Sequence, residues 1–444
     1  MLNSALEVKE ILYDLIHGLN STANLYTKSP NKDFTRNRKL SFEKVITLLL
    51  GMGGGSLSNE LMDYFGCTTE LVTASAFVQQ RKKILPTALE ALFHKFVEKT
   101  DTATLYNGYR LLAVDGSALQ IPTDQDDVDS FYPNVSGKES YNLLHINAMY
   151  DLLGHTYVDA VVQKGRIRDE NRALINMVDR AAFNHPAILL ADRGYESYNV
   201  FAHIQEKGWR YLIRIKDNGV NGGIAHGLNL PTQDEYDLPI QMSFTRSISN
   251  KSKQLAAARN RYKILYRHQN FDFLPPKVDA SAPVVFYNIS FRIVRFKISD
   301  DSYETVITNL DPNFFPPPKL KELYAMRWGI ETSFRQLKHT IGLLHFHAKK
   351  AELICQEIFA RLVMHNFTQL IITFTNISKS SNKYTYKVNF SAAAHICRLF
   401  FLDNIVSLTP ETLIARFIFP IRPNRFTPRV QTKKSFMSFS YRMA

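Results

Sequence analysis

Apolar positions recur with helical periodicity over the first part of the chain. Up to about residue 105 they follow spacings of three and four, as among Ile11, Leu12, Leu15 and Ile16. Two short helical patterns, Leu57–Tyr64 and Thr73–Ile84, flank a turn that begins at Gly66. This pair is compatible with a helix-turn-helix that reads DNA and equally with plain helix packing. Residues 1–105 are therefore predicted to form a helical domain.

The periodicity changes after Tyr109, where short apolar runs typical of buried strands begin. Three strands are predicted in succession, and two further strands then alternate with two helices. The strands are 111–114, 143–149, 156–162, 187–191 and 210–215, and the helices are 169–182 and 198–207. This order predicts an α/β fold with a mixed sheet covered by helices over residues 106–216.

Three further segments follow this core. Residues 217–318 are first polar and then strand-rich, and we interpret them as an inserted β-rich subdomain with strands at 262–266, 284–296 and 303–308. Residues 319–350 return to the core through a long helix predicted from about Leu320 to Ile341. Residues 351–444 are predicted to be helical, with a polar loop at Ser378–Asn382 and a basic tail.

Composition adds a charge argument to this organisation. The 444 residues include 54 Lys and Arg against 41 Asp and Glu, a formal net charge of +13, and 45% are hydrophobic, which argues against disorder. From Thr332 to Ala444 there are 16 Lys and Arg but four acids, and residues 412–444 contain no acid. Such a surplus of positive charge indicates that the protein binds nucleic acid or, as a second choice, an anionic membrane surface. The alternative is that the charge only keeps the protein soluble.

Cysteine usage and the N-terminus indicate the compartment. The three cysteines form no CxxC pattern and leave one unpaired, which fits a reducing environment. The first 20 residues contain three acids and read as an amphipathic helix rather than a signal peptide. Since no run approaches the roughly 18 apolar residues of a membrane span, we expect a cytoplasmic protein.

Two carboxylates occupy equivalent places in the predicted sheet. Asp115 and Asp192 each directly follow an apolar strand and precede a turn. Groups at the carboxyl ends of strands converge at one sheet edge. Two carboxylates placed there favour a hard cation, Mg²⁺ or Mn²⁺, between them. The alternative is that each Asp only caps its turn.

A third carboxylate lies in the predicted long helix. At about 100° per residue, Tyr324, Arg327, Glu331 and Lys338 share an arc of roughly 60° that borders the apolar face of this helix. Charges at that border suit a site between the helix and the sheet edge. The alternative is an exposed ion pair between Arg327 and Glu331.

These residues resemble the insertion-sequence transposases of family four. The resemblance rests on Asp115-Gly-Ser, on Asp192-Arg-Gly-Tyr195, and on Tyr324-x2-Arg327-x3-Glu331-x6-Lys338 within YAMRWGIETSFRQLK, and it covers about residues 35–350. It implies a DDE catalytic domain with a ribonuclease H-like fold.

The resemblance also implies a mechanism and site residues. Asp115, Asp192 and Glu331 would hold two Mg²⁺ ions, with Mn²⁺ as a substitute, for in-line displacement at phosphorus. Water would free a 3′-hydroxyl at each terminal inverted repeat, and that hydroxyl would attack target DNA. Further side chains are expected to contact DNA: Tyr324, Arg327, Lys338, Arg193, Gln79, Arg81, Lys82 and Lys83.

Other residues are given lesser roles. The acids at Asp124–Asp129 are interpreted as a solvated loop off the DNA path, and Trp328 is expected to pack rather than to act in chemistry. His345 and His347 lack the ligand spacing of a zinc site. The base-flipping aromatic of the family stays unassigned, because both tryptophans lie outside the predicted insertion.

The sequence therefore predicts a bacterial DNA transposase that acts on double-stranded DNA at the nucleoid, as a homodimer in its synaptic complex. Three alternatives remain open. The chain could be a nuclease of the same fold without strand transfer, a catalytically inactive DNA-binding derivative, or a membrane-surface protein that uses the basic tail.

Overall fold

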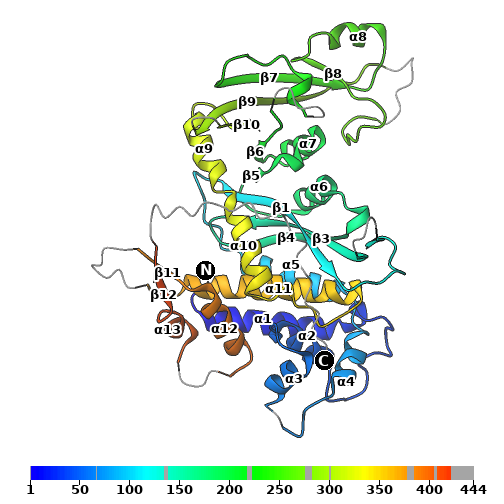
Figure 1. Ribbon diagram of the computed structural model, residues 1–444, viewed down its shortest axis with the longest axis vertical. Coiled ribbons are helices and arrows are strands. Elements are labelled where there is room, and N and C mark those ends of the chain that lie inside the picture. The colour runs from blue at the N-terminus through cyan, green and yellow to red at the C-terminus, as the bar shows by residue number, and fades with distance from the viewer. Residues whose placement is uncertain are drawn as a thin grey trace.

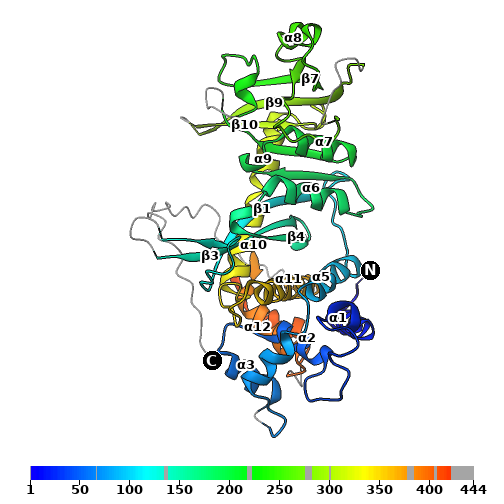
Figure 2. The ribbon, with the colours of Figure 1, turned by 90° about the vertical axis from the view of Figure 1, so that its right-hand side faces the viewer.

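The computed structural model describes residues 2–66, 68–134, 139–217, 223–275, 283–299, 302–377, 385–404 and 408–421. The predicted loop at Ser378–Asn382 and most of the predicted basic tail lie outside these residues. The molecule is elongated, with the terminal helices at one end and the strands of the predicted insertion at the other (Figures 1 and 2).

The N-terminal region is helical, as predicted. Its helices are α1 (Ala5–Ser21), α2 (Phe42–Gly51), α3 (Leu57–Phe65), α4 (Ala74–Arg81) and α5 (Thr87–Lys99). Ser or Thr hydroxyls cap the first four, as when Ser56 accepts a hydrogen bond from the backbone N–H of Asn59. The bounds of α3 and α4 agree with the predicted helix pair.

The C-terminal helices pack onto this N-terminal region. They are α11 (Ala351–Thr373), α12 (Phe390–Phe401) and α13 (Pro410–Ile414), with a two-stranded sheet of β11 (Tyr386–Val388) and β12 (Ile418–Pro420) beside them. Helix α11 is buried from Gln356 to Ile371 between α5, α2, α12 and the sheet (Figure 1). The two ends of the chain thus share one helical layer.

The central sheet confirms the predicted order of strands and helices. Its elements are β1 (Arg110–Ile121), β2 (Phe131–Tyr132), β3 (Tyr141–Asp151), β4 (Thr156–Lys164), α6 (Glu170–Arg180), β5 (Ala187–Ala191), α7 (Tyr198–Glu206) and β6 (Arg210–Arg214). Strand β1 pairs antiparallel with β3 and parallel with β5, and β5 pairs parallel with β6. The fold is a mixed sheet flanked by helices.

The predicted insertion is strand-rich, but its strands continue the central sheet. It contains β7 (Tyr236–Thr245), α8 (Asn250–Ala256), β8 (Tyr262–Ile264), β9 (Tyr287–Ser299) and β10 (Ser302–Thr308). Strand β10 pairs antiparallel with β6, and the sheet then extends through β9, β7 and β8. No separate sheet forms among these strands. Strand β7 was not predicted from the sequence.

The predicted long helix is two helices, which corrects the single helix from Leu320 to Ile341. They are α9 (Pro317–Ala325) and α10 (Trp328–His339). The amides of Met326 and Arg327 bond three residues back, at 3.2 and 3.0 Å, so a tighter 3₁₀-type turn joins the helices. A helical wheel at 100° per residue therefore holds within α10 but not from Tyr324 onward.

Both faces of the sheet are buried. Leu111 and Ala113 of β1 face the core formed with α5, α9, α10 and α11, while Leu112 and Val114 face the core formed with α6 and α7. Burial on both faces explains the continuous apolar runs of these strands. No helix in the described ranges combines the length and apolar character that crossing a membrane requires.

Candidate active site

Asp115 and Asp192 lie side by side at one edge of the parallel part of the sheet. Val114 of β1 is paired with Ala191 of β5, and Asp115 and Asp192 are the next residues along the chain. The prediction that this strand ends just before Asp115 is wrong, because the pairing of β1 with β3 continues to Ile121. Asp115 instead marks the point where pairing with β5 stops.

The Asp115 carboxyl is largely buried and lies among other charges. Its Oδ1 accepts the backbone N–H of Gly116 at 2.8 Å. Burial raises the pKa of Asp115 to about 6; Glu331 and Asp192 also raise it, whereas the Gly116 amide and Arg327 lower it. The three predicted carboxylates are therefore close enough to disfavour each other's charge.

Asp192 is held by an arginine that sequence reasoning missed. Its Oδ1 lies 2.8 Å from Nε of Arg214, the last residue of β6, and it accepts the backbone N–H of Arg193 at 2.7 Å. Arg214 also reaches Glu304 of β10, at 3.2 Å. The position of Arg214 at the end of a strand beside β5 was the available signal.

Glu331 reaches the same edge from the first turn of α10. Its Oε1 accepts a hydrogen bond from Nη2 of Arg327 at 2.9 Å. The ion pair weighed as an alternative is therefore present, but it is not a solvated pair, because the Arg327 side chain is only 5% exposed. Its Nε has no hydrogen-bond partner among the described residues.

Tyr324 and Lys338 complete the group on this side. The Tyr324 hydroxyl lies 3.5 Å from the carbonyl oxygen of Ala191, and its ring lies beneath the Arg327 guanidinium. Burial lowers the pKa of Lys338, and the nearby Asp115 opposes that shift. The four spaced residues thus come together at the aspartates, although a helix break separates Tyr324 from the others.

Trp328 does not pack as predicted. Its side chain is 47% exposed at the start of α10, and the Arg327 guanidinium lies 5.5 Å from the ring centroid. At about 100° per residue Trp328 lies roughly 160° round α10 from the buried Ile330, so the helical wheel itself accounts for its exposure. An exposed indole beside the carboxylates offers a stacking surface for a base.

Tyr195 and an ion pair between His145 and Glu170 lie on the opposite face of the sheet at the same edge. The Tyr195 hydroxyl is buried and has no hydrogen-bond partner among the described residues. Burial raises the pKa of Tyr195, and the nearby charges of Asp115, Glu170 and Asp192 raise it as well. Nε2 of His145 lies 3.0 Å from Oε1 of Glu170. Sequence reasoning quoted Tyr195 within its motif but gave none of these residues a role.

Gly116 explains how His145 approaches the strand. A Cβ at position 116 would lie 2.5 Å from Nε2 of His145, closer than side chains tolerate. Glycine directly after Asp115 therefore lets the imidazole of the neighbouring strand lie against β1.

The donor set fits a hard cation, although the described residues do not form a closed metal site. As these side chains are arranged here, with arginines paired to two of the carboxylates, no group of three or more His, Cys, Asp and Glu among the described residues could hold an ion. Arginines occupy oxygens of Asp192 and Glu331 that a cation would take. Burial raises the pKa of Asp115 although the Gly116 amide and Arg327 lower it, so these two groups compensate its negative charge only in part.

The predicted DNA contacts of α4 are only partly exposed. Gln79 and Lys82 are exposed, and Nζ of Lys83 bonds to Oε1 of Gln80 at 3.0 Å. Arg81 is buried at 1% exposure and forms a 2.8 Å ion pair with Glu357 of α11. The prediction that Arg81 contacts DNA is wrong, because it follows the buried Phe77 by one helical turn and faces the core.

Two other predicted positions are also located. Arg193 is exposed directly beside Asp192. Asp127, within the acidic loop, is paired rather than solvated, because its Oδ1 lies 2.7 Å from Nζ of Lys164.

Known proteins that are similar to this chain are transposases. Residues 106–367 match the family described as "Transposase DDE domain". The chain is 20% identical over 349 residues to the transposase InsG for insertion sequence element IS4 of Escherichia coli (strain K12), which covers 75% of this chain and 70% of that protein. The cryo-EM structure of the piggyBac transposase synaptic complex with hairpin DNA aligns with a TM-score of 0.44 and 9% identity, over 98% of this chain and 88% of that one.

Proposed function

Because the chain belongs to the DDE-domain transposase family, as a DNA transposase of the IS4 type, we propose that Asp115, Asp192 and Glu331 are its catalytic carboxylates. The register of β1 and β5 carries this proposal, since it makes the two aspartates neighbours at one sheet edge. Glu331 lies at the same edge, where its charge raises the pKa of Asp115.

We propose that these carboxylates hold two Mg²⁺ ions, or Mn²⁺ in their place. When bound, the ions would activate the attacking oxygen and stabilise the leaving oxygen of the displacement at phosphorus. Asp115 would bind in its charged form. Arg214 and Arg327 would release Asp192 and Glu331, and their guanidinium groups would then be available to phosphate oxygens.

The residues around the carboxylates are proposed to position the DNA. Arg327, Lys338 and Arg193 would contact phosphates of the terminal nucleotides, while Tyr324 would orient the strand at the site. Gln79 on α4, and Lys82 and Lys83 directly after it, would contact the terminal inverted repeat. Hydrolysis at the repeat would free a 3′-hydroxyl, which would then be joined to target DNA in the same site.

The strand order supports a ribonuclease H-like catalytic core. Strands β4, β3 and β1 are antiparallel neighbours, and β5 and β6 continue the sheet parallel to β1. We further propose a homodimer in the synaptic complex, because two element ends must be joined, and a location at the nucleoid in the cytoplasm, where the DNA lies.

The test replaces Asp192→Asn in the full chain. Magnesium-dependent cleavage of a duplex that carries the element end should fall by roughly 100-fold or more, while binding of the same duplex is kept. Asp126→Asn, in the exposed part of the acidic loop, is the matched control and should cleave normally. Undiminished cleavage by the Asp192 variant would refute the catalytic assignment.

Strand transfer needs its own measurement. Incubating the wild-type protein with a pre-cleaved end that carries a 3′-hydroxyl and a supercoiled target plasmid should give joined products on a gel. Cleavage without any joined product would instead identify a nuclease of this fold.

A further inference from the structure

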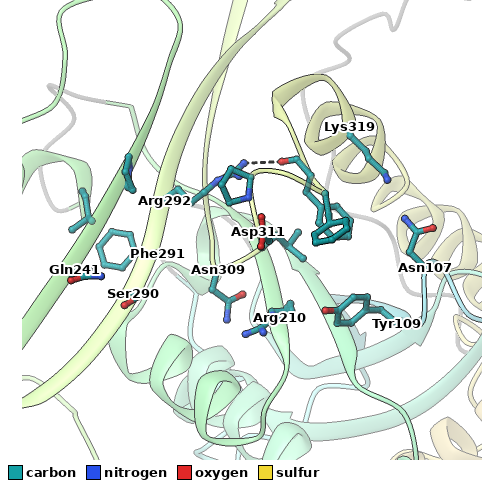
Figure 3. Close-up of a pocket in the computed structure, with 16 residues that line it drawn as sticks. Asn107, Tyr109, Arg210, Gln241, Ser290, Phe291, Arg292, Asn309, Asp311 and Lys319 are labelled. Atoms are coloured by element: carbon teal, nitrogen blue, oxygen red, sulfur yellow. Dashed lines mark hydrogen bonds between the residues drawn. The ribbon is translucent and has the colours of Figure 1, made fainter.

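A large cavity lies at the opposite end of α9 from the carboxylates. It measures about 1150 Å³ and is bounded by the turn before β1, the start of β6, strands β7 and β9, and the loop that leads into α9. Figure 3 shows Tyr109 and Lys319 on one side, Gln241 and Ser290 on the other, and Arg210 between them. None of its residues belongs to the proposed catalytic set.

Cations outnumber acids around this cavity. Arg210, Arg292 and Lys319 line it together with a single acid, Asp311. Oδ1 of Asp311 accepts the backbone N–H of Asn313 at 2.8 Å, so that oxygen is engaged within its own loop. Arg210 is exposed and has no ion pair among the described residues. The cavity therefore presents a net positive charge to an incoming ligand.

Arg292 is the buried member of this group. It is 5% exposed, its Nη2 donates to the carbonyl oxygen of Phe315 at 2.9 Å, and its Nε lies 3.3 Å from Oδ1 of Asp237. Its Nη1 has no hydrogen-bond partner among the described residues. A buried guanidinium donor without a partner is costly, and an anionic oxygen in the cavity would satisfy it.

Flat apolar side chains line the same cavity. Phe314 is 70% exposed, an unusual position for a large aromatic side chain. Tyr109 and Phe315 also line the cavity and lie edge to face, with centroids 6.4 Å apart, and Nζ of Lys319 lies 5.1 Å from the Phe315 ring centroid. Aromatic faces next to cations are the combination that binds single-stranded nucleic acid, by base stacking and phosphate contact.

We propose that this cavity binds an unpaired nucleotide of DNA, with the base stacked on Phe314 and the phosphate contacted by Arg292 and Arg210. The ligand class rests on the DNA function of the chain, but the site is separate from the carboxylates. A protein segment is a less favourable occupant, because it would need acidic side chains to pair with Arg210, Arg292 and Lys319 beside the apolar walls.

The test measures binding of a fluorescein-labelled single-stranded hexathymidylate to the full chain by anisotropy, in EDTA. Phe314→Ala and Arg210→Gln change exposed side chains, so both variants should fold, as circular dichroism will check. Each should bind roughly fivefold more weakly or worse, and Arg210→Gln should also reduce the slope of log affinity against log salt by about 0.7.

Matched controls are Ile248→Ala and Lys253→Gln, two exposed changes outside the cavity lining. They should bind as the wild type does. Because the binding is measured in EDTA, without any cleavage step, its failure would leave the catalytic proposal standing. Wild-type affinity in both cavity variants, or equal losses in the controls, would overturn the proposal. Photo-crosslinking of a 5-iodouracil oligonucleotide should label residues 309–319, and label confined to other segments would also overturn it.

Discussion

Asp115 shows what folding imposes on a single residue of the site. The carboxyl is buried beside two other carboxylates, and this environment raises its pKa to about 6. The folded protein therefore holds a proton that the unfolded chain releases at lower pH, and the charged form destabilises the metal-free fold. Residues that are held in unfavourable states without their ligand are typical of functional sites.

The charge of the Asp115 carboxylate predicts that Asp115→Asn stabilises the metal-free protein, and that this gain depends on pH. The folded pKa is raised from 3.8 to about 6, so the destabilisation by Asp115 develops between these values and is complete at higher pH. At pH 8 the variant should be more stable to unfolding by about 1–3 kcal/mol, since one pKa unit corresponds to about 1.4 kcal/mol. The gain should be much smaller at pH 4.5.

Urea denaturation followed by circular dichroism at both pH values in EDTA measures this gain, with Asp126→Asn as the control that should change little. A variant that is less stable than the wild type at pH 8 would contradict the account of an only partly compensated charge.

Trp328 gives a second prediction at this scale. Because about half of the indole is buried and it contacts the Arg327 guanidinium, Trp328→Ala should lower the free energy of unfolding by about 1–2 kcal/mol. If the ring stacks on a base beside the carboxylates, end-DNA affinity should fall by roughly fivefold or more, and Trp328→Phe should restore part of it. Equal DNA affinity in the wild type and Trp328→Ala would show that the indole does not stack on a base.

At the scale of elements, sequence reasoning succeeded where periodicity is local and failed where packing decides. Most strands and helices from β1 to β6 follow apolar runs and were predicted within a few residues, but β1 ends at Ile121 rather than at residue 114, and β2 was not predicted. The break between α9 and α10 was missed because its residues keep helical backbone angles and only their hydrogen bonds tighten. Arg81 was misassigned because the Glu357 partner lies 276 positions later in the chain and has no local signal.

The contact between α4 and α11 predicts that Arg81→Ala destabilises the fold. Removing Arg81 leaves Glu357 buried without its closest cation, which should cost about 3–5 kcal/mol. Burial alone would raise the pKa of Glu357, but Arg81, His347 and Arg361 lower it to about 2. The stabilisation is therefore present above the ordinary Glu pKa and is lost as the pH falls toward 2.

Urea denaturation at pH 7 checks this cost, and Lys82→Ala, an exposed neighbour on the same turn, should stay within about 0.5 kcal/mol of the wild type. If Arg81→Ala instead kept full stability and lost DNA affinity, the original assignment of Arg81 to DNA binding would be restored.

At the scale of the whole molecule, the first and last segments of the chain depend on each other. The carboxylate of Glu411 accepts the backbone N–H of Ala5 at 3.0 Å, and the Tyr13 hydroxyl donates to the carbonyl oxygen of Phe401 at 2.7 Å. Buried α11 lies between the two segments. The sequence predicted both as helical, but it could not show that they form one layer, since pairing between distant segments leaves no local pattern.

A shared layer predicts that the N-terminal region cannot be removed as an independent module. A chain of residues 106–444 should lose cooperative unfolding and aggregate on size-exclusion chromatography, because α11 would expose its buried face. A chain of residues 1–421 keeps every described residue and is the control that should stay folded. A stable, monomeric 106–444 fragment would show that the two ends fold separately.

The open sheet has a consequence for how such a protein can diverge. Beyond β10 the sheet grows outward through β9 and β7 to β8, its last strand on that side, while the carboxylates stay on β1, on α10 and directly after β5. Chain added or removed near β8 would lengthen or shorten this margin without disturbing the register of Val114 and Ala191. Descendants can therefore vary the outer margin of the sheet over generations while the three carboxylates keep their places.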